Sequence, residues 1–275
     1  MVGSVKQISR EIAQMQHESQ KVEMADAHCH LDILEDSSLL LNAINMGVHT
    51  IITNGINSTS SRRALDLSEG RYIFPAIGVD PETAVSMEGD ALDKEIEHVV
   101  KLMRDNRKKI VAVGEIGLDF MKAKTPEALV RQKKTFGKML DMAKELDLPV
   151  SVHSRNSMDA VLDMLKEREM KKVHLHFFEG SVMQAKEAEK RGYMISIPPL
   201  ESRSRKDVIK DVSIDRLMAE SDCPVAGKSP LDVEFSIHMI ADLKGIPFAK
   251  AADILTQNTK RFFEIDRVKL GGIRG

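Results

Sequence analysis

Short runs of β-branched and other apolar residues alternate about eight times with longer charged segments between residues 24 and 264. The longer segments repeat apolar residues at the period of an α-helix, whereas the short runs have the length and composition of buried strands. Strands and helices that alternate in this way form an α/β fold with a parallel sheet. About eight repeats in about 250 residues predict a TIM (β/α)8-type barrel. The expected strands are 24–28, 48–53, 72–79, 110–116, 149–153, 172–177, 193–197 and 214–219, and the expected helices are 36–46, 58–69, 90–107, 126–147, 156–170, 181–191, 203–211, 231–244 and 247–264.

A doubly wound open sheet is the main alternative to the barrel. Its dinucleotide-binding form is disfavoured because no G-x-G-x-x-G motif follows the first predicted strand. We divide the chain into an N-terminal helical extension at 1–23, a barrel at 24–265 and a C-terminal tail at 266–275. The extension is expected to form one extra amphipathic helix. Its apolar positions recur at helical spacing among charged residues, at Val5, Ile8, Ile12 and Met15.

The charge balance argues against a general attraction to nucleic acids or anionic membranes. Forty Lys and Arg residues and forty-two Asp and Glu residues give a net charge of −2 over 275 residues. Affinity for a polyanion must therefore come from a local patch or a bound cation. No apolar run approaches the ~18 residues of a membrane helix. We expect a cytoplasmic protein, because Cys29 and Cys223 are too few for a disulfide framework and the N-terminal residues lack the apolar centre of a secretory signal.

Histidines concentrate at the ends of the predicted strands, where barrel enzymes hold their reactive side chains. His28 and His30 end the first strand two residues apart, so both side chains point to the same side of it. Glu115 and Asp222 add carboxylates at the ends of the fourth and eighth strands. Histidines and carboxylates drawn from several strand ends are typical of a site for one or two divalent metal ions. The other strand-end histidines are His153, His174 and His176.

Five of these strand-end segments resemble, in the same order, the motifs of the TatD family of metal-dependent hydrolases. A lone His-x-His pair is a weak indication of a family, whereas five ordered motifs are a strong one. The similarity covers about residues 24–265 and leaves the N-terminal extension outside. The matching segments are 26–32, 114–119, 153–155, 176–180 and 220–224, and 256–263 resembles the closing helix of the family.

The resemblance implies a TIM barrel of the amidohydrolase type with deoxyribonuclease activity. It implies that one metal ion is held by His28, His30, Glu115 and Asp222. It also implies that Glu115 bridges to a second ion, bound by His153 and His176, and that Asp222 takes a proton from the attacking water. We expect two divalent ions per chain, with Mg, Mn and Zn as candidates, because imidazoles suit Zn or Mn whereas nucleases of such families commonly use Mg.

The charge of this donor set agrees with a phosphodiester substrate. Four neutral imidazoles and two carboxylates carry two negative charges, so two divalent ions would leave about two positive charges. Arg155 lies two residues after His153, and its guanidinium either clamps a phosphate with two hydrogen bonds or forms a salt bridge to a neighbouring loop. His174 is expected to be a hydrogen-bonded core histidine, one layer deeper than His176.

The segment after the third strand departs from the family pattern. TatD relatives typically carry Gly-Ile-His-Pro-His there, and this chain has Gly78-Val79-Asp80-Pro81-Glu82. Two carboxylates therefore replace two imidazoles that would face the substrate, and Asp80 is the expected substrate-binding residue on this side. Carboxylates disfavour a nearby phosphate. The chain also has few aromatic rings, with no Trp and two Tyr, on which the bases of single-stranded DNA could stack.

These observations leave three functions to compare. The leading one is a metal-dependent phosphodiesterase that acts on DNA. The alternative is an amidohydrolase-type enzyme that cleaves a C–N or C–O bond of a small molecule, which Asp80 and Glu82 favour. The third is a non-enzymatic scaffold whose N-terminal helix docks a partner, and the presence of all six candidate metal ligands argues against it. No membrane partner is expected.

Overall fold

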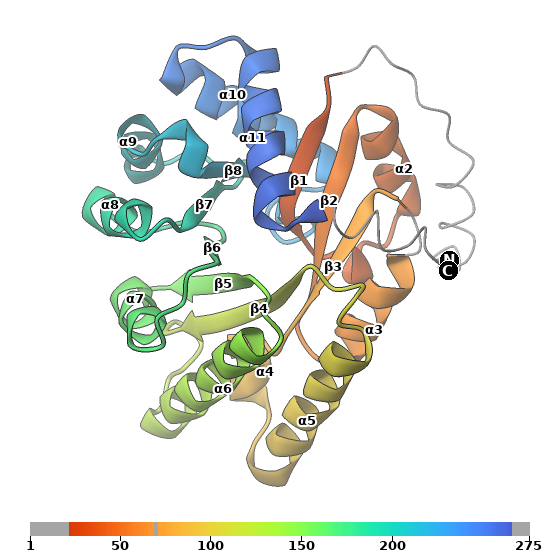
Figure 1. Ribbon diagram of the computed structural model, residues 1–275, viewed down its shortest axis with the longest axis vertical. Helices are drawn as coiled ribbons and strands as arrows, with labels where there is room; N and C mark the ends of the chain where they lie inside the picture. Colours follow the sequence, from red (N-terminus) through yellow and green to blue (C-terminus); the bar gives the residue numbers. More distant parts are fainter. Residues whose placement is uncertain (1–21, 69–70, 266–275) are drawn as a thin grey trace.

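The computed structural model describes residues 22–68 and 71–265, which form eight parallel strands with helices around them (Figure 1). Each strand pairs with the next one along the chain, from β1 with β2 to β7 with β8. This order is that of a TIM barrel and confirms the predicted fold class. The strands are β1 (Met24–Cys29), β2 (Val48–Gly55), β3 (Ile73–Ile77), β4 (Ala112–Asp119), β5 (Val150–Arg155), β6 (Val173–Leu175), β7 (Met194–Ile197) and β8 (Leu217–Ala219).

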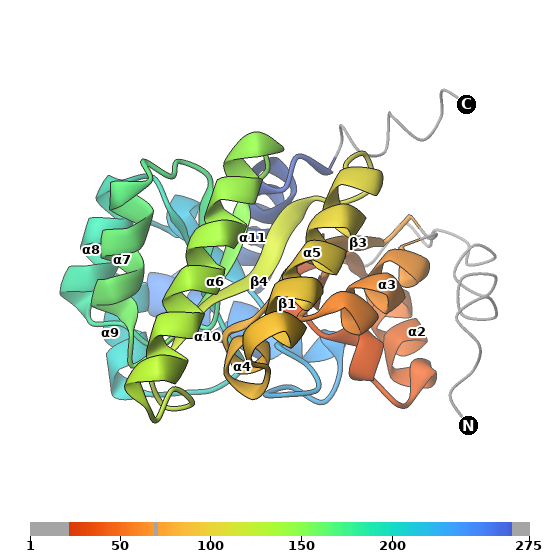
Figure 2. The same cartoon turned by 90° about the horizontal axis from the view of Figure 1, so that it is seen from below.

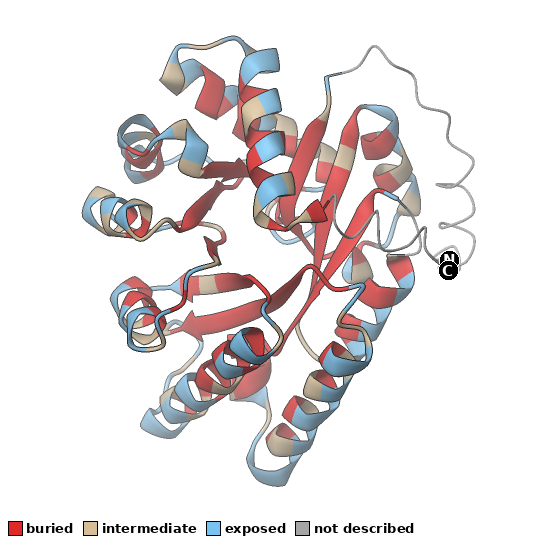
Figure 3. Cartoon of the chain, in the orientation of Figure 1, coloured by how far each residue is buried: buried red, intermediate tan, exposed pale blue. Residues whose placement is uncertain are grey.

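All nine expected helical segments form helices, and one short helix, α4 (Pro81–Ser86), was not expected. The helices turn their buried faces to the strands and their exposed faces outward (Figure 3). Figure 2 shows how α5 and α6 lie across the outside of β4. The expected helices are α2 (Ser37–Asn45), α3 (Ser58–Leu67), α5 (Gly89–Asp105), α6 (Pro126–Glu145), α7 (Met158–Glu167), α8 (Val182–Lys190), α9 (Arg203–Asp211), α10 (Val233–Lys244) and α11 (Phe248–Phe262).

Several strand boundaries differ from those predicted. β8 begins at Leu217 rather than at residue 214, because the Ser213 hydroxyl accepts a hydrogen bond from the Asp215 N–H and starts a 3-10 turn, η2 (Ile214–Arg216). β6 ends at Leu175 rather than at residue 177, because Phe177 has a positive φ of 45°, which is incompatible with an extended strand. β4 instead continues to Asp119, beyond the predicted end at residue 116.

The barrel interior is stacked in layers. Ala27, Ile52 and Met218 belong to one apolar cluster, and Phe263 and Ile265 from beyond α11 pack in the same cluster. The next layer is polar, because buried His174 hydrogen bonds to the hydroxyl groups of two serines, Ser151 (3.1 Å) and Ser196 (2.7 Å). The carboxyl ends of the strands therefore lie on a closed and packed interior.

Backbone hydrogen bonds beyond the end of β8 join the last strand to the first. The Asp222 N–H donates to the His28 carbonyl oxygen (2.9 Å), and the His30 N–H donates to the Cys223 carbonyl oxygen (2.7 Å). The Asp26 carboxylate accepts hydrogen bonds from both the backbone N–H (2.8 Å) and the hydroxyl (2.5 Å) of Ser221. We call these contacts the β1–β8 seam. The seam fixes the relative positions of the polar residues that follow both strands.

The expected N-terminal helix at 1–23 lies almost entirely outside the described residues, and the expected tail at 266–275 lies wholly outside them. Within 22–68 and 71–265, none of the helices has the length and apolar character needed to cross a membrane.

Candidate metal centre

All six candidate metal ligands converge at the carboxyl ends of the strands. Each lies within a strand or one to three residues beyond its end, so the barrel directs the side chains toward one another. Five of the six residues are buried, and the side chain of His153 is 23% exposed. The six residues are His28 (β1), His30 (after β1), Glu115 (β4), His153 (β5), His176 (after β6) and Asp222 (after β8).

The two oxygens of Glu115 face two different pairs of histidines. Glu115 Oε2 lies 3.5 Å from His28 Nε2 and 3.3 Å from His30 Nε2. Glu115 Oε1 lies 3.0 Å from His153 Nδ1 and 3.2 Å from His176 Nε2. The carboxylate therefore stands between two groups of donor atoms, each of which can hold a metal ion.

Asp222 completes the group around His28 and His30. Its Oδ1 atom lies 3.5 Å from His30 Nε2 and 3.9 Å from His28 Nε2. Donor atoms of Asp222, His28 and His176 also lie within 4.8 Å of one another. Asp222 itself has a positive φ of 46°, a backbone conformation that Asp adopts more readily than most residues.

The donor atoms fit a bound cation better than they fit one another. The nitrogens of His28 and His30 approach to 3.3 Å, and those of His153 and His176 approach to 3.2 Å. The outer nitrogen of His30 lies 3.1 Å from the Asn54 carbonyl oxygen, which can only accept a hydrogen bond, so Nδ1 carries the proton. Nε2 faces the carboxylates of Glu115 and Asp222, and a cation bound there would take the place of the second proton of the ring.

Charges within the centre shift the protonation of its members in opposite directions. Burial lowers the pKa of His28 well below its usual value, and the neighbouring His176 adds to that effect. Burial alone would lower the pKa of His30, but the hydrogen bonds that its ring donates to Asp222 and Glu115 outweigh burial and raise the pKa well above the usual value. Burial would raise the pKa of Glu115, but the surrounding histidines reverse that shift. The carboxylate therefore stays ionised and favours any cation placed between the rings.

A second set of residues orients the candidate ligands. The Ser151 hydroxyl lies 3.2 Å from His28 Nδ1, and Asp119 Oδ2 lies 3.4 Å from His153 Nε2. Carboxylates and carbonyls that hold the outer nitrogen of a ligating histidine fix its ring and its tautomer. Asp119 lies in the motif at 114–119, but no role is predicted for it from the sequence. Asp119 is the last residue of β4 and lies two residues after the glycine that follows Glu115 and Ile116. This position at a strand end is the signal that could have indicated its role.

Glu220 is a further residue without a predicted role. It is fully buried, and its Oε2 atom lies 3.9 Å from His176 Nδ1 and 2.6 Å from the Ser196 hydroxyl. Its Oε1 atom accepts a hydrogen bond from the Phe177 N–H (2.6 Å). Burial raises the pKa of Glu220 well above its usual value, and the charge of Asp222 contributes. Glu220 thus anchors the loop that carries His176.

The cysteines and His174 lie outside the centre. His174 is the hydrogen-bonded core histidine that the sequence predicts, one layer below His176. Cys29 points to the core outside the barrel, and Cys223 is buried in the same core. Their sulfurs and a carboxylate oxygen of Asp26 form a separate buried group, with donor atoms within 4.8 Å of one another.

A cavity of about 440 Å³ opens above the centre and contains both predicted substrate-binding residues. Arg155 is exposed at its rim. Asp80 is buried in its wall, where burial and the charge of Glu115 raise the pKa of Asp80 to about 6. Glu82 lies beside it and forms an ion pair of 2.9 Å with Lys122. The rim also exposes three apolar side chains, Ile33, Leu200 and Val225.

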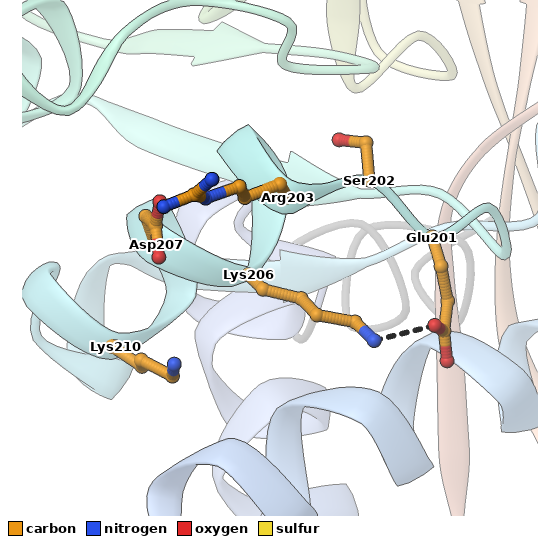
Figure 4. Close-up of a pocket in the computed structure, with 6 residues that line it drawn as sticks. All are labelled: Glu201, Ser202, Arg203, Lys206, Asp207 and Lys210. Carbon is orange, nitrogen blue, oxygen red and sulfur yellow. Dashed lines mark ion pairs between the residues drawn. The ribbon is translucent and has the colours of Figure 1, made fainter.

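A second depression lies on the outer side of α9 and contains none of the candidate ligands (Figure 4). Lys206 forms an ion pair of 2.5 Å with Glu201 there, and Arg203, Asp207 and Lys210 are exposed to solvent. Among the basic residues at 203–206, Arg205 is buried. That residue is 7% exposed and turns inward to the wall of the cavity above the centre.

Comparison with known proteins identifies relatives over nearly the whole described chain. A family model described as TatD related DNase matches residues 25–264. The chain is 31% identical to the uncharacterized metal-dependent hydrolase YabD of Bacillus subtilis, over 88% of this chain and 99% of that protein. It is 29% identical to the deoxyribonuclease TATDN3 of Homo sapiens, over 88% of this chain and 95% of that protein.

A solved structure agrees with the sequence comparison. The crystal structure of YjjV, a TatD homologue from Escherichia coli, superimposes with a TM-score of 0.79 at 27% identity. The match covers 88% of this chain and 98% of that one. The similarity therefore includes every strand that contributes to the centre.

Proposed function

Because the chain belongs to the family of TatD-related DNases, we propose that it is a metal-dependent phosphodiesterase that hydrolyses DNA. The observation that supports this most directly is the placement of Glu115, whose two oxygens each face a separate pair of histidines. A carboxylate shared by two donor groups is suited to bridge two divalent ions. Two-metal centres of this kind are used for displacement at phosphorus.

The proposed division of ligands follows the geometry. His28, His30, Glu115 and Asp222 would hold one ion, and Glu115, His153 and His176 would hold the other. When bound, such ions lower the pKa of water toward about 7 and polarise a phosphoryl oxygen. Mg, Mn and Zn are the candidate metals, and the imidazole-rich donor set favours Mn or Zn.

The residues of the chain supply the remaining chemistry. Asp222 lies at the edge of the cavity, where its carboxylate accepts a proton from the attacking water. Arg155 offers a guanidinium at the rim to a phosphate oxygen of the substrate. Asp80, buried in the wall of the same cavity, limits how far a second phosphate can approach, because like charges repel.

The experiment that tests this function combines metal replacement with one substitution. The protein is stripped with EDTA, reloaded with Mg, Mn or Zn, and assayed for cleavage of single-stranded DNA while its metal content is determined by elemental analysis. Asp222→Asn is expected to lower kcat by about 10²- to 10⁴-fold, as for loss of a general base. Asp207→Asn, a carboxylate change on the exposed side of α9, serves as the control. Cleavage that is unaffected by EDTA, or absent with all three metals, would contradict the proposal.

One observation favours a second candidate, an amidohydrolase-type enzyme that cleaves a C–N or C–O bond of a small molecule. The rim combines the carboxylates of Asp80 and Glu82 with exposed apolar side chains such as Ile33 and Val225. This surface suits a compact, partly apolar substrate better than a polyanion. Turnover of lactones or cyclic amides by the metal-loaded protein, with no cleavage of DNA, would establish this alternative.

A further inference from the structure

Phe177 is the residue of the cavity wall whose position is most tightly fixed. It directly follows the candidate ligand His176, and its half-buried ring lines the cavity above the centre. Its N–H donates to Glu220 Oε1 at 2.6 Å, which holds the backbone at a φ of 45°. The ring lies at 75° to that of His176, with the two centroids 6.4 Å apart. Phe177 is thus a planar apolar surface at a set distance from the metal ligands.

A buried cation covers one face of this ring. The guanidinium carbon of Arg205 lies 5.5 Å from the centroid of Phe177, although Arg205 is only 7% exposed. One end of the guanidinium donates to the Leu200 carbonyl oxygen, and its Nε has no hydrogen-bond partner among the described residues. The contact with the ring therefore adds to the nearby charges of Glu179 and Glu220 in compensating for the burial of this cation. Arg205 thus packs against one face of the Phe177 ring and restricts its movement.

We propose that Phe177 is a stacking platform for a nucleobase of the substrate, held next to the phosphodiester that is cleaved. This inference rests on the proposed function and identifies the nucleobase as the part of the substrate that Phe177 recognises. Among the residues that line the cavity in the described chain, Phe177 is the one that offers a carbocyclic aromatic ring. Stacking on an aromatic side chain strengthens binding about 5- to 150-fold per base and tolerates any base, because every base has a planar face. We therefore expect the enzyme to prefer a substrate that carries a base at this position, without a preference for which base it is.

Removal of the ring tests the proposal by its effect on KM. The substrates are a short deoxyoligonucleotide and an oligomer of the same length made of abasic deoxyribose phosphates. Phe177→Leu is expected to raise KM for the first about 5- to 150-fold and to leave KM for the second unchanged. Phe177→Tyr, which keeps the ring, is expected to behave as wild type. Phe120→Leu removes a ring from the end of β4 that does not line this cavity and serves as the control.

A binding measurement gives a second readout that does not depend on catalysis. The probe is 2-aminopurine deoxyribonucleoside monophosphate, which contains no phosphodiester bond and whose fluorescence is quenched on stacking. The chain has no Trp, so emission from the protein does not interfere. Quenching is expected with wild type and with Phe177→Tyr, and not with Phe177→Leu.

The two measurements separate failure of this inference from failure of the proposed function. Equal KM values of wild type for the base-containing and the abasic oligomer would overturn the stacking platform while leaving the phosphodiesterase intact. A parallel rise of KM for both oligomers in Phe177→Leu would also overturn it, because the ring would then only support the fold. Loss of cleavage of every phosphodiester with retained quenching in wild type would overturn the proposed function and support the base site.

Discussion

At the scale of single residues, Glu115 is the candidate ligand that lies between the two groups of donor atoms. Each of its oxygens approaches nitrogens of two histidines, at 3.0 to 3.5 Å. His153, in contrast, contacts one side of the centre only and is partly exposed. Removal of these two residues should therefore have different effects on metal content.

We expect two divalent ions per chain in wild type, one in His153→Ala, and weakened binding of both in Glu115→Ala. Loss of the shared carboxylate removes a ligand and a negative charge from both groups, with an expected fall in affinity of at least about tenfold. Elemental analysis after gel filtration, together with calorimetric titration, measures both quantities.

His98→Ala, at an exposed position on α5, is the matched control and should retain two ions. Retention of two tightly bound ions by Glu115→Ala would show that the carboxylate does not bridge.

The strand-end histidines were predictable because their spacing and location follow from the barrel alone. His28 and His30 lie two residues apart at the end of β1, and this pattern is visible in the sequence. The partners of their outer nitrogens were not predictable. Asn54 contributes a backbone carbonyl from β2 and Ser151 a hydroxyl from β5, so both contacts depend on how the strands are aligned in space.

At the scale of elements, the helix α4 shows where local sequence patterns are insufficient. Six residues are too few to display a helical period, although Asp80 before the helix and Pro81 at its first position are local signals for a helix start. The helix forms because Asp80 accepts a hydrogen bond from the Thr83 N–H (2.8 Å) and caps it. The same residue lies in the cavity wall, so the cap also places a carboxylate near the centre.

The pKa of Asp80 predicts a pH-dependent contribution to stability. Burial raises it from 3.8 to about 6, with a further contribution from the charge of Glu115. Between these pH values the unfolded chain has released a proton that the folded protein retains, so wild type loses stability as the pH rises. Asp80→Asn keeps the cap oxygen without the charge. Its advantage over wild type should grow from near zero below pH 4 to about 3 kcal/mol above pH 6.

Urea unfolding of the EDTA-treated proteins between pH 4 and pH 8 measures this difference. Asp207→Asn, on the exposed side of α9, should show none. A stability difference between Asp80→Asn and wild type that does not change with pH would refute a raised pKa.

The early end of β6 has a similar explanation in tertiary contacts. The run at 172–177 has the composition of a strand throughout, yet the chain turns after Leu175. The Phe177 N–H is held by Glu220, a residue more than forty positions away. A local sequence pattern therefore cannot predict this contact.

At the scale of the whole molecule, the barrel was predictable because each strand and helix repeats the same alternation. The closure of its lower end was not predictable. Phe263 and Ile265 fill the interior below the polar layer, whereas the sequence indicates only that a helix closes the chain. Which end of that helix enters the barrel depends on packing against β1 and β8.

Bound metal should stabilise the whole barrel, because the candidate ligands come from strands on all sides of it. A ligand at 100 times its Kd contributes about 2.7 kcal/mol when it binds only the folded state, which raises Tm by roughly 5 to 10 °C for a domain of this size. Thermal unfolding with and without Mn or Zn measures the shift. EDTA should reverse it, and Glu115→Ala should show a smaller one.

Amide hydrogen exchange measures which parts of the barrel are stabilised by bound metal. Metal should slow exchange most at the His30 and Asp222 N–H groups, which form the β1–β8 seam. A rise in Tm of equal size in Glu115→Ala would show that the metal acts elsewhere.

The β1–β8 seam also has a consequence for the order in which the candidate centre can form during synthesis. Asp26 and Ser221 are 195 positions apart. Asp26 therefore emerges from the ribosome long before Ser221. A growing chain already displays His28 and His30 but has neither Asp222 nor the bonds that hold it in place. We therefore expect nascent chains to lack the proposed hydrolytic activity until the residues that follow the eighth strand have emerged.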